Sequence, residues 1–148
     1  MQIEGTHVLS ASREAIWALL LNPETLARVT PGITRLEPIG EHSYKAISEV
    51  KIGPVDGSFA GNMEVEDQVP PESFVLKMRQ NSKIGNVTAK GNIFLKAIDP
   101  STTEVEFSGK AQLSGLLART GQRVLSGVAR TLTDQFFKAL EKELETTS

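Results

Sequence analysis

The central part of the chain alternates between apolar and polar residues with a period of two. Residues 43–52, SYKAISEVKI, set small or apolar side chains at the even positions against mostly charged ones at the odd positions. The alternation recurs in residues 58–66, 74–79, 87–96 and 104–113, and the turn signals GPVDG, VPPES, NSKIGN and DPST separate these segments. Consecutive strands with one apolar face predict an antiparallel sheet with one buried face and one solvent-exposed face.

Helical patterns flank this sheet on both sides. Residues 2–10 predict a first strand, and SASREAIWALLLNP predicts a helix with Ser12 as its N-cap. Pro23 ends this helix or opens a second short one, PETLARVT, and the PG pair at residues 31–32 predicts a turn. Residues 114–146 predict one long helix whose sheet-facing side carries Leu117, Gly121, Val124, Leu125, Val128 and Leu132.

The inward face of the predicted sheet is rich in small residues, which are Ala46, Ser48, Gly61, Ala89, Gly91, Gly109 and Ala111. Either these residues leave room for an apolar ligand between the sheet and the long helix, or the glycines curve the sheet as bulges and the helix packs flush. Strand parity and helical phase predict the lining of the pocket in the first case: Tyr44, Ser48, Phe59, Gly61, Met63, Leu76, Met78, Ala89, Gly91, Phe107, Gly109, Gly121, Val124, Leu125 and Val128.

Composition excludes several classes of protein. The chain has 148 residues, which suits a single domain over residues 1–148, and a net charge of −2, which gives no basic excess for nucleic acid. It has no cysteine, so disulfides and cysteine-based metal sites are excluded. The N-terminus MQIEGTHVLS is not a signal peptide, and no stretch approaches the roughly 18–20 apolar residues of a membrane span. We therefore expect a cytoplasmic protein.

No catalytic constellation and no metal site stand out. The two histidines, His7 and His42, lack metal-ligand spacing, and there is neither a nucleophile elbow nor a phosphate loop. His7 is either a polar contact for a ligand carbonyl or a strand histidine with an ordinary partner, whereas His42 falls in a turn. Trp17 has the helical spacing of a core residue. Its alternative role is to form part of a pocket wall. We expect no catalytic residue, no metal and no cofactor.

Three arginines, Arg119, Arg123 and Arg130, project almost opposite the apolar face of the long helix, with Phe137 near them. Positive charge early in a helix opposes the macrodipole, so helix stability does not require them. They form either a solvated face or a contact for an acidic partner or anionic lipid headgroups, and in the second case charge reversal of all three weakens that binding.

Nearly the whole chain resembles one family. The segments that carry the resemblance are EGTHVLSASREAIWALLLNPETLARVTPGITRLE, KIGPVDGSFAG, GNVTAKGNIFL and LARTGQRVLSGVARTLTDQFF. Together they resemble the G-subunit family of carbon monoxide dehydrogenase, within the START-like (SRPBCC) superfamily. The resemblance implies an α+β helix-grip fold, in which a curved antiparallel sheet wraps around a long C-terminal helix and two short helices follow the first strand.

The resemblance also implies a function. Members of this family are associated with molybdenum hydroxylases of the carbon monoxide dehydrogenase type, with proposed roles in maturation, membrane recruitment and binding of a lipid or isoprenoid quinone in an elongated cavity. We expect a non-catalytic accessory protein of this kind, with peripheral contact at the inner face of the membrane as a further possibility. Two alternatives stay open: a protein–protein adaptor with a filled core, and a START-like cyclase or hydrolase.

Overall fold

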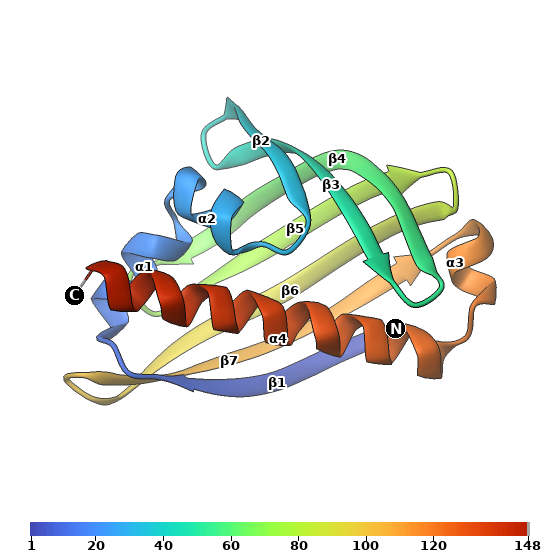
Figure 1. The fold of residues 1–148 in the computed structure, drawn as a ribbon. Coiled ribbons are helices and arrows are strands. Elements are labelled where there is room, and N and C mark those ends of the chain that lie inside the picture. The colour runs from blue at the N-terminus through green and yellow to red at the C-terminus, as the bar shows by residue number, and fades with distance from the viewer. Residues whose placement is uncertain (148) are drawn as a thin grey trace.

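The computed structural model, which describes residues 1–147, confirms the α+β helix-grip fold (Figure 1). The elements follow the order β1 (Gln2–Leu9), α1 (Arg13–Leu20), α2 (Pro23–Val29), β2 (Ile33–Gly40), β3 (Ser43–Ile52), β4 (Val55–Val69), β5 (Ser73–Ser82), β6 (Gly85–Asp99), β7 (Thr102–Leu113), α3 (Gly115–Arg119) and α4 (Gln122–Thr147). Seven strands form one antiparallel sheet in the order β1-β7-β6-β5-β4-β3-β2, and α4 crosses one face of it.

The two short helices begin where the sequence predicts. The Ser12 side chain accepts a hydrogen bond from the Ala15 amide at 3.2 Å and caps α1. Asn22 caps α2 by accepting from the Glu24 amide at 2.9 Å, and Pro23 stands at its first position, where no amide hydrogen is needed. Both helices lie beside the C-terminal half of α4 (Figure 1).

The predicted alternation sets the two faces of the sheet. In β6, the odd positions from Gly85 to Leu95 are buried or half-buried, and the even positions from Asn86 to Phe94 are exposed. The KIGPVDG segment turns in two residues, because Ile52 pairs with Val55 and Gly53 adopts a φ of +56°. Glycine and proline in this segment therefore serve a hairpin, as expected.

The predicted single C-terminal helix is wrong. Gly121 adopts a φ of +101° between α3 and α4 and is exposed, so it breaks the helix instead of facing the sheet. Val124, in the first turn of α4, is 43% exposed and also lies off the covered face. Arg119 consequently lies in the last turn of α3, where a cation is favourable to the helix dipole.

The core is divided into three clusters. One lies around α1 and the C-terminal half of α4, and it includes Ile16, Leu95 and Leu140. A second joins α3 and the N-terminal part of α4 to the β3–β4 hairpin, and a third joins Leu26 of α2 to the sheet. Phe137 lines a groove together with Arg130, one of the arginines it was predicted to lie near. It is nevertheless 5% exposed within the first cluster, because the buried stripe of α4 turns as the helix crosses the sheet.

An ion pair holds α2 against α4. The Arg28 Nε donates to Glu143 Oε1 at 2.6 Å, and this hydrogen bond lowers the pKa of Glu143 below its usual value. A carboxyl with a lowered pKa in the folded state contributes stability above the pKa of the unfolded chain, and this contribution is lost as the pH falls through the folded pKa. The contact therefore stabilises the fold at neutral pH and not in acid.

We expect Glu143→Gln to remove part of the acid sensitivity of the protein. Urea unfolding should show a lower midpoint than wild type at neutral pH, and the difference should shrink as the pH falls below 4.5, the ordinary value for a glutamate. Glu49→Gln, at an exposed position on β3, is the matched control and should leave the difference near zero. A Glu143→Gln deficit that stays constant with pH would contradict this role of the ion pair.

Candidate functional site

Most of the predicted pocket residues lie on the covered face of the sheet or on the buried side of α4. The buried ones are Tyr44, Phe59, Met63, Leu125 and Val128. The half-buried ones are Ser48, Gly61, Leu76, Met78, Ala89, Gly91, Phe107 and Gly109. Gly121 and Val124 are exposed and do not join this group.

The half-buried residues gather at the middle of the sheet. Met78 pairs with Ala89, and Gly91 pairs with Gly109 across the next two strands. None of these four residues belongs to any of the three core clusters. Along α4, the residues packed on the second cluster extend to Leu132 and those packed on the first begin at Phe136, about 6 Å of helix later.

The glycines of this face serve different purposes. A Cβ on Gly61 would lie 1.8 Å from the Arg79 carbonyl oxygen, so β4 approaches β5 too closely there for any side chain. A Cβ on Gly109 would lie 3.0 Å from the Lys90 carbonyl oxygen, which is also tight. A Cβ on Gly91 would meet nothing nearer than 3.5 Å, so packing against neighbouring strands does not require glycine at this position.

Gln80 is an inward-facing polar residue outside the predicted pocket lining. It lies on β5 two residues beyond Met78, and it is 6% exposed. Its Nε2 donates to the Arg79 carbonyl at 3.2 Å, whereas its Oε1 has no hydrogen-bond partner within residues 1–147. A buried acceptor without a partner costs free energy. Continued strand parity beyond Met78 would have identified it.

A groove of about 330 Å³ lies between the edge strand β1 and α4. Its walls combine apolar and polar side chains, which are Gln2, Ile3, Glu4, Thr6, His7, Phe107, Ser126, Ala129, Arg130, Thr133, Asp134 and Phe137. His7 stacks on Phe137 with ring centroids 4.4 Å apart, and its Nε2 lies 2.6 Å from Glu141 Oε1. The groove therefore opens beside an imidazole–carboxylate pair.

Sequence reasoning placed His7 on the inward face of its strand but missed its partners. Phe137 and Glu141 stand one helical turn apart, so both meet the same residue of β1. The sequence therefore shows that Phe137 and Glu141 lie on the same side of α4. It does not show which residue of β1, more than a hundred residues away, they contact. Trp17 is a core residue as predicted, half-buried against the first cluster with its ring edge on Phe74.

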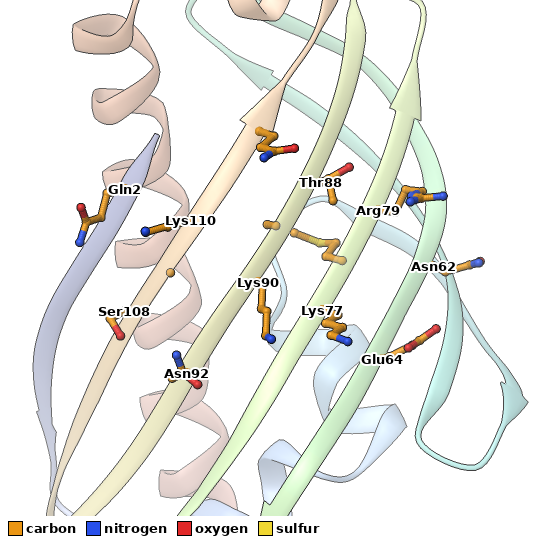
Figure 2. A pocket seen from close by; sticks show the side chains of 14 residues that line it. Gln2, Asn62, Glu64, Lys77, Arg79, Thr88, Lys90, Asn92, Ser108 and Lys110 are labelled. Atoms are coloured by element: carbon orange, nitrogen blue, oxygen red, sulfur yellow. The ribbon is translucent and has the colours of Figure 1, made fainter.

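A second hollow, of about 760 Å³, lies on the opposite face of the sheet from α4 (Figure 2). Polar side chains of β1 and β4–β7 surround it, among them Lys77, Arg79, Lys90 and Lys110. The alternation in the sequence predicted these polar positions only as part of the water-exposed face. Three residues predicted to line the inner pocket, Met78, Ala89 and Gly109, also border this hollow.

Two further features bear on chemistry. Within the described part of the chain, no group of three or more histidine and acidic residues is placed to hold a metal ion. In the same residues, no helix combines the length and apolar character needed to span a membrane.

One protein family matches nearly the whole chain. The family model described as the G subunit of carbon monoxide dehydrogenase (CoxG) matches residues 5–145. A crystal structure of a conserved protein from Geobacillus kaustophilus is similar at 33% identity, with 99% of this chain and 97% of that chain covered and a TM-score of 0.97. No curated protein matches the sequence.

More distant structures share the fold. A START superfamily protein from Mycobacterium smegmatis has 14% identity, covers 99% of each chain and has a TM-score of 0.80. The Zhui aromatase/cyclase from Streptomyces sp. R1128 also has 14% identity, with 98% of this chain and 93% of that chain covered and a TM-score of 0.72. At this identity the likeness concerns the fold alone.

Proposed function

The chain belongs to the CoxG family of carbon monoxide dehydrogenase, and from this premise we propose that it binds a hydrophobic small molecule between its sheet and α4. It acts without catalysis, as an accessory protein to a molybdenum hydroxylase of the carbon monoxide dehydrogenase type. Its place is the cytoplasm, with peripheral contact at the inner face of the membrane.

One observation carries the proposal. Met78, Ala89 and Gly91 belong to the face of the sheet that α4 crosses, yet they remain half-buried and belong to no core cluster. Met78 and Ala89 also border the hollow of the outer face, whereas Gly91 does not. Protein interiors are normally close-packed, with few voids larger than a water molecule. Apolar and small side chains that stay incompletely covered at the middle of a sheet therefore indicate space for an apolar molecule.

The chemistry of this region suits a long, thin ligand with one polar end. Its walls are aliphatic, aromatic or glycine, and its inward polar groups are few, with Ser48 and Gln80 foremost. Binding pockets commonly combine an apolar lining with a few such groups. A lipid or an isoprenoid quinone has this shape and chemistry.

An enzyme is the second candidate, and the pair formed by His7 and Glu141 favours it. An imidazole held 2.6 Å from a carboxylate is the arrangement of a general base, and it borders the groove. A purified protein that turns over a polyketide or ester substrate, and loses that activity in His7→Phe, would establish the enzyme. The accessory role predicts no such turnover.

Mass spectrometry of organic extracts from purified protein tests the proposal. We expect a lipid or quinone to copurify, and we expect added quinone to raise the melting temperature, since a ligand at a hundredfold its dissociation constant stabilises by about 2.7 kcal/mol. Repeated absence of any extracted lipid, together with a melting temperature that no quinone changes, would support an adaptor with a filled core instead.

A further inference from the structure

A row of like charges crosses the outer face of the sheet, the face opposite α4. Lys77 of β5 pairs directly with Lys90 of β6, and Lys90 pairs directly with Lys110 of β7. Like charges directly opposite one another on antiparallel strands are destabilising. The fold therefore gains nothing from this row, and three neighbouring lysines call for another explanation.

Ion pairs neutralise little of this charge. Lys77 lies 2.9 Å from Glu66, which raises the pKa of that lysine through their hydrogen bond. Within residues 1–147, Arg79, Lys90 and Lys110 have no carboxylate within 4.0 Å. In that same range, Glu64 is the one acidic side chain that lines the hollow. The hollow therefore carries a local positive charge although the whole chain has a net charge of −2.

The surface is also concave and rich in neutral hydrogen-bonding groups. The four cations line a hollow of about 760 Å³ together with Gln2, Asn62, Thr88, Asn92, Ser108 and Gln112 (Figure 2). Adjacent strands lie about 4.8 Å apart, so the ammonium groups of the lysine row repeat over about 10 Å. Carboxylates at alternate positions of an extended chain repeat about every 7 Å, so two of them fall within the length of the row.

We propose that this hollow is the docking surface for an acidic segment of a partner protein, which crosses β5, β6 and β7 with two carboxylates shared among Lys77, Lys90 and Lys110. Arg79 and the surrounding amide and hydroxyl side chains bind the backbone and polar side chains of that segment. The charged side chains of the docking surface point away from the ligand space, although Met78, Ala89 and Gly109 border both. Binding of the acidic segment does not require any particular ligand in the interior.

Other anionic occupants fit less well. A bilayer surface is flat and favours exposed aromatic anchors, whereas this surface is concave and its lining, within the described residues, contains no aromatic side chain. Single-stranded nucleic acid is bound by stacking on aromatic side chains, which the described lining does not supply. A small phosphate ligand is usually held by backbone amides or by paired arginines, and here the strand ladder uses the amides.

The test uses the full chain and a fluorescent peptide of alternating glutamate and serine, at low and at physiological salt. We expect saturable binding that weakens with salt and amide shifts confined to β5–β7 in NMR spectra. Lys90→Gln with Lys110→Gln should weaken binding about tenfold. The same double variant should melt at or above the wild-type temperature, because it relieves the opposed charges.

Two variants serve as matched controls. Lys138→Gln with Lys142→Gln removes the same charge from exposed positions on α4 and should leave peptide binding unchanged. Replacing Arg119, Arg123 and Arg130 with glutamate tests the arginine surface that the sequence suggested as a partner contact. This variant should also leave peptide binding unchanged.

Several results would overturn the docking surface. These are equal binding by wild type and the Lys90–Lys110 variant, loss of binding in the arginine variant, or no peptide binding at low salt. Lysine-dependent binding to phosphatidylserine vesicles without peptide binding would assign the face to a membrane. Lysine-dependent self-association in analytical ultracentrifugation would assign it to a second copy of the chain.

Discussion

Replacing Gly91 with leucine should weaken binding of a prenyl-chain ligand about fivefold to a hundredfold while leaving the free energy of unfolding unchanged or higher. Gly91 lies on the inward face of β6, and a Cβ at this position meets nothing nearer than 3.5 Å. If the space beyond it is empty, the leucine buries apolar surface there, and full burial of such a side chain is worth about 1.5–3 kcal/mol. If the core is filled, overpacking costs about 1–3 kcal/mol.

The sign of the stability change therefore separates a ligand binder from an adaptor with a packed core. Urea unfolding gives the stability, and titration with a short-chain quinone gives the affinity. A leucine that overlaps the bound ligand should cost roughly 1–3 kcal/mol, which is about fivefold to a hundredfold in affinity. The combination of lower stability and unchanged quinone binding would contradict the proposed ligand space.

Asn92→Leu is the matched control for this substitution. Asn92 is the next residue of β6, and its side chain is exposed on the outer face (Figure 2). The same leucine placed there should leave quinone affinity at the wild-type value. A similar loss of affinity from both variants would mean that β6 itself had been disturbed.

Gly61→Ala should be more destabilising than alanine at Gly57, Gly91 or Gly109. The added methyl would lie 1.8 Å from the Arg79 oxygen and 2.8 Å from its carbonyl carbon, and these are backbone atoms that a rotamer change cannot move. The two strands would have to separate where Gly61 pairs with Gln80. We expect the free energy of unfolding, measured in urea, to fall by about 3 kcal/mol or more, because losses of this size result from backbone clashes of this kind.

Gly57→Ala on the same strand is the control for Gly61→Ala. A Cβ at Gly57 has its nearest contact 3.7 Å away, at the end of the Ile84 side chain. Alanine there should be neutral or slightly stabilising, because it reduces the freedom of the unfolded chain. If the two variants unfold at the same urea concentration, β4 and β5 do not approach so closely at Gly61.

The fold was predictable because periodicity is a local property of the sequence. Alternation in β3 to β7 fixed which side chains face inward, and Ser12 and Pro23 marked the starts of α1 and α2. The break at Gly121 was not recognised, because Leu117 and Leu125 keep helical spacing across it. A positive φ at one residue ends a helix without disturbing that spacing.

The site was less predictable, because it depends on how elements meet. The sequence left two explanations of the small inward residues open, a ligand space or a curved sheet with a flush helix, and Gly61 and Gly109 are explained by the close approach of neighbouring strands. Close approach of strands does not explain Gly91. Together with Met78 and Ala89, Gly91 remains the support for a ligand space. The stack of His7 on Phe137 required the position of α4 relative to β1, which no local pattern specifies.

Xenon binding tests most directly whether the space between the sheet and α4 is unfilled, since apolar cavities take up xenon without any knowledge of the natural ligand. Protein labelled on its methyl groups and stripped of lipid would be observed by NMR under xenon pressure. We predict saturable shifts at the methyls of Met78 and Ala89 and none at Ile16 or Leu140, which are 0% exposed in the first core cluster. Methyl signals of Met78 and Ala89 that do not respond to xenon would contradict the account.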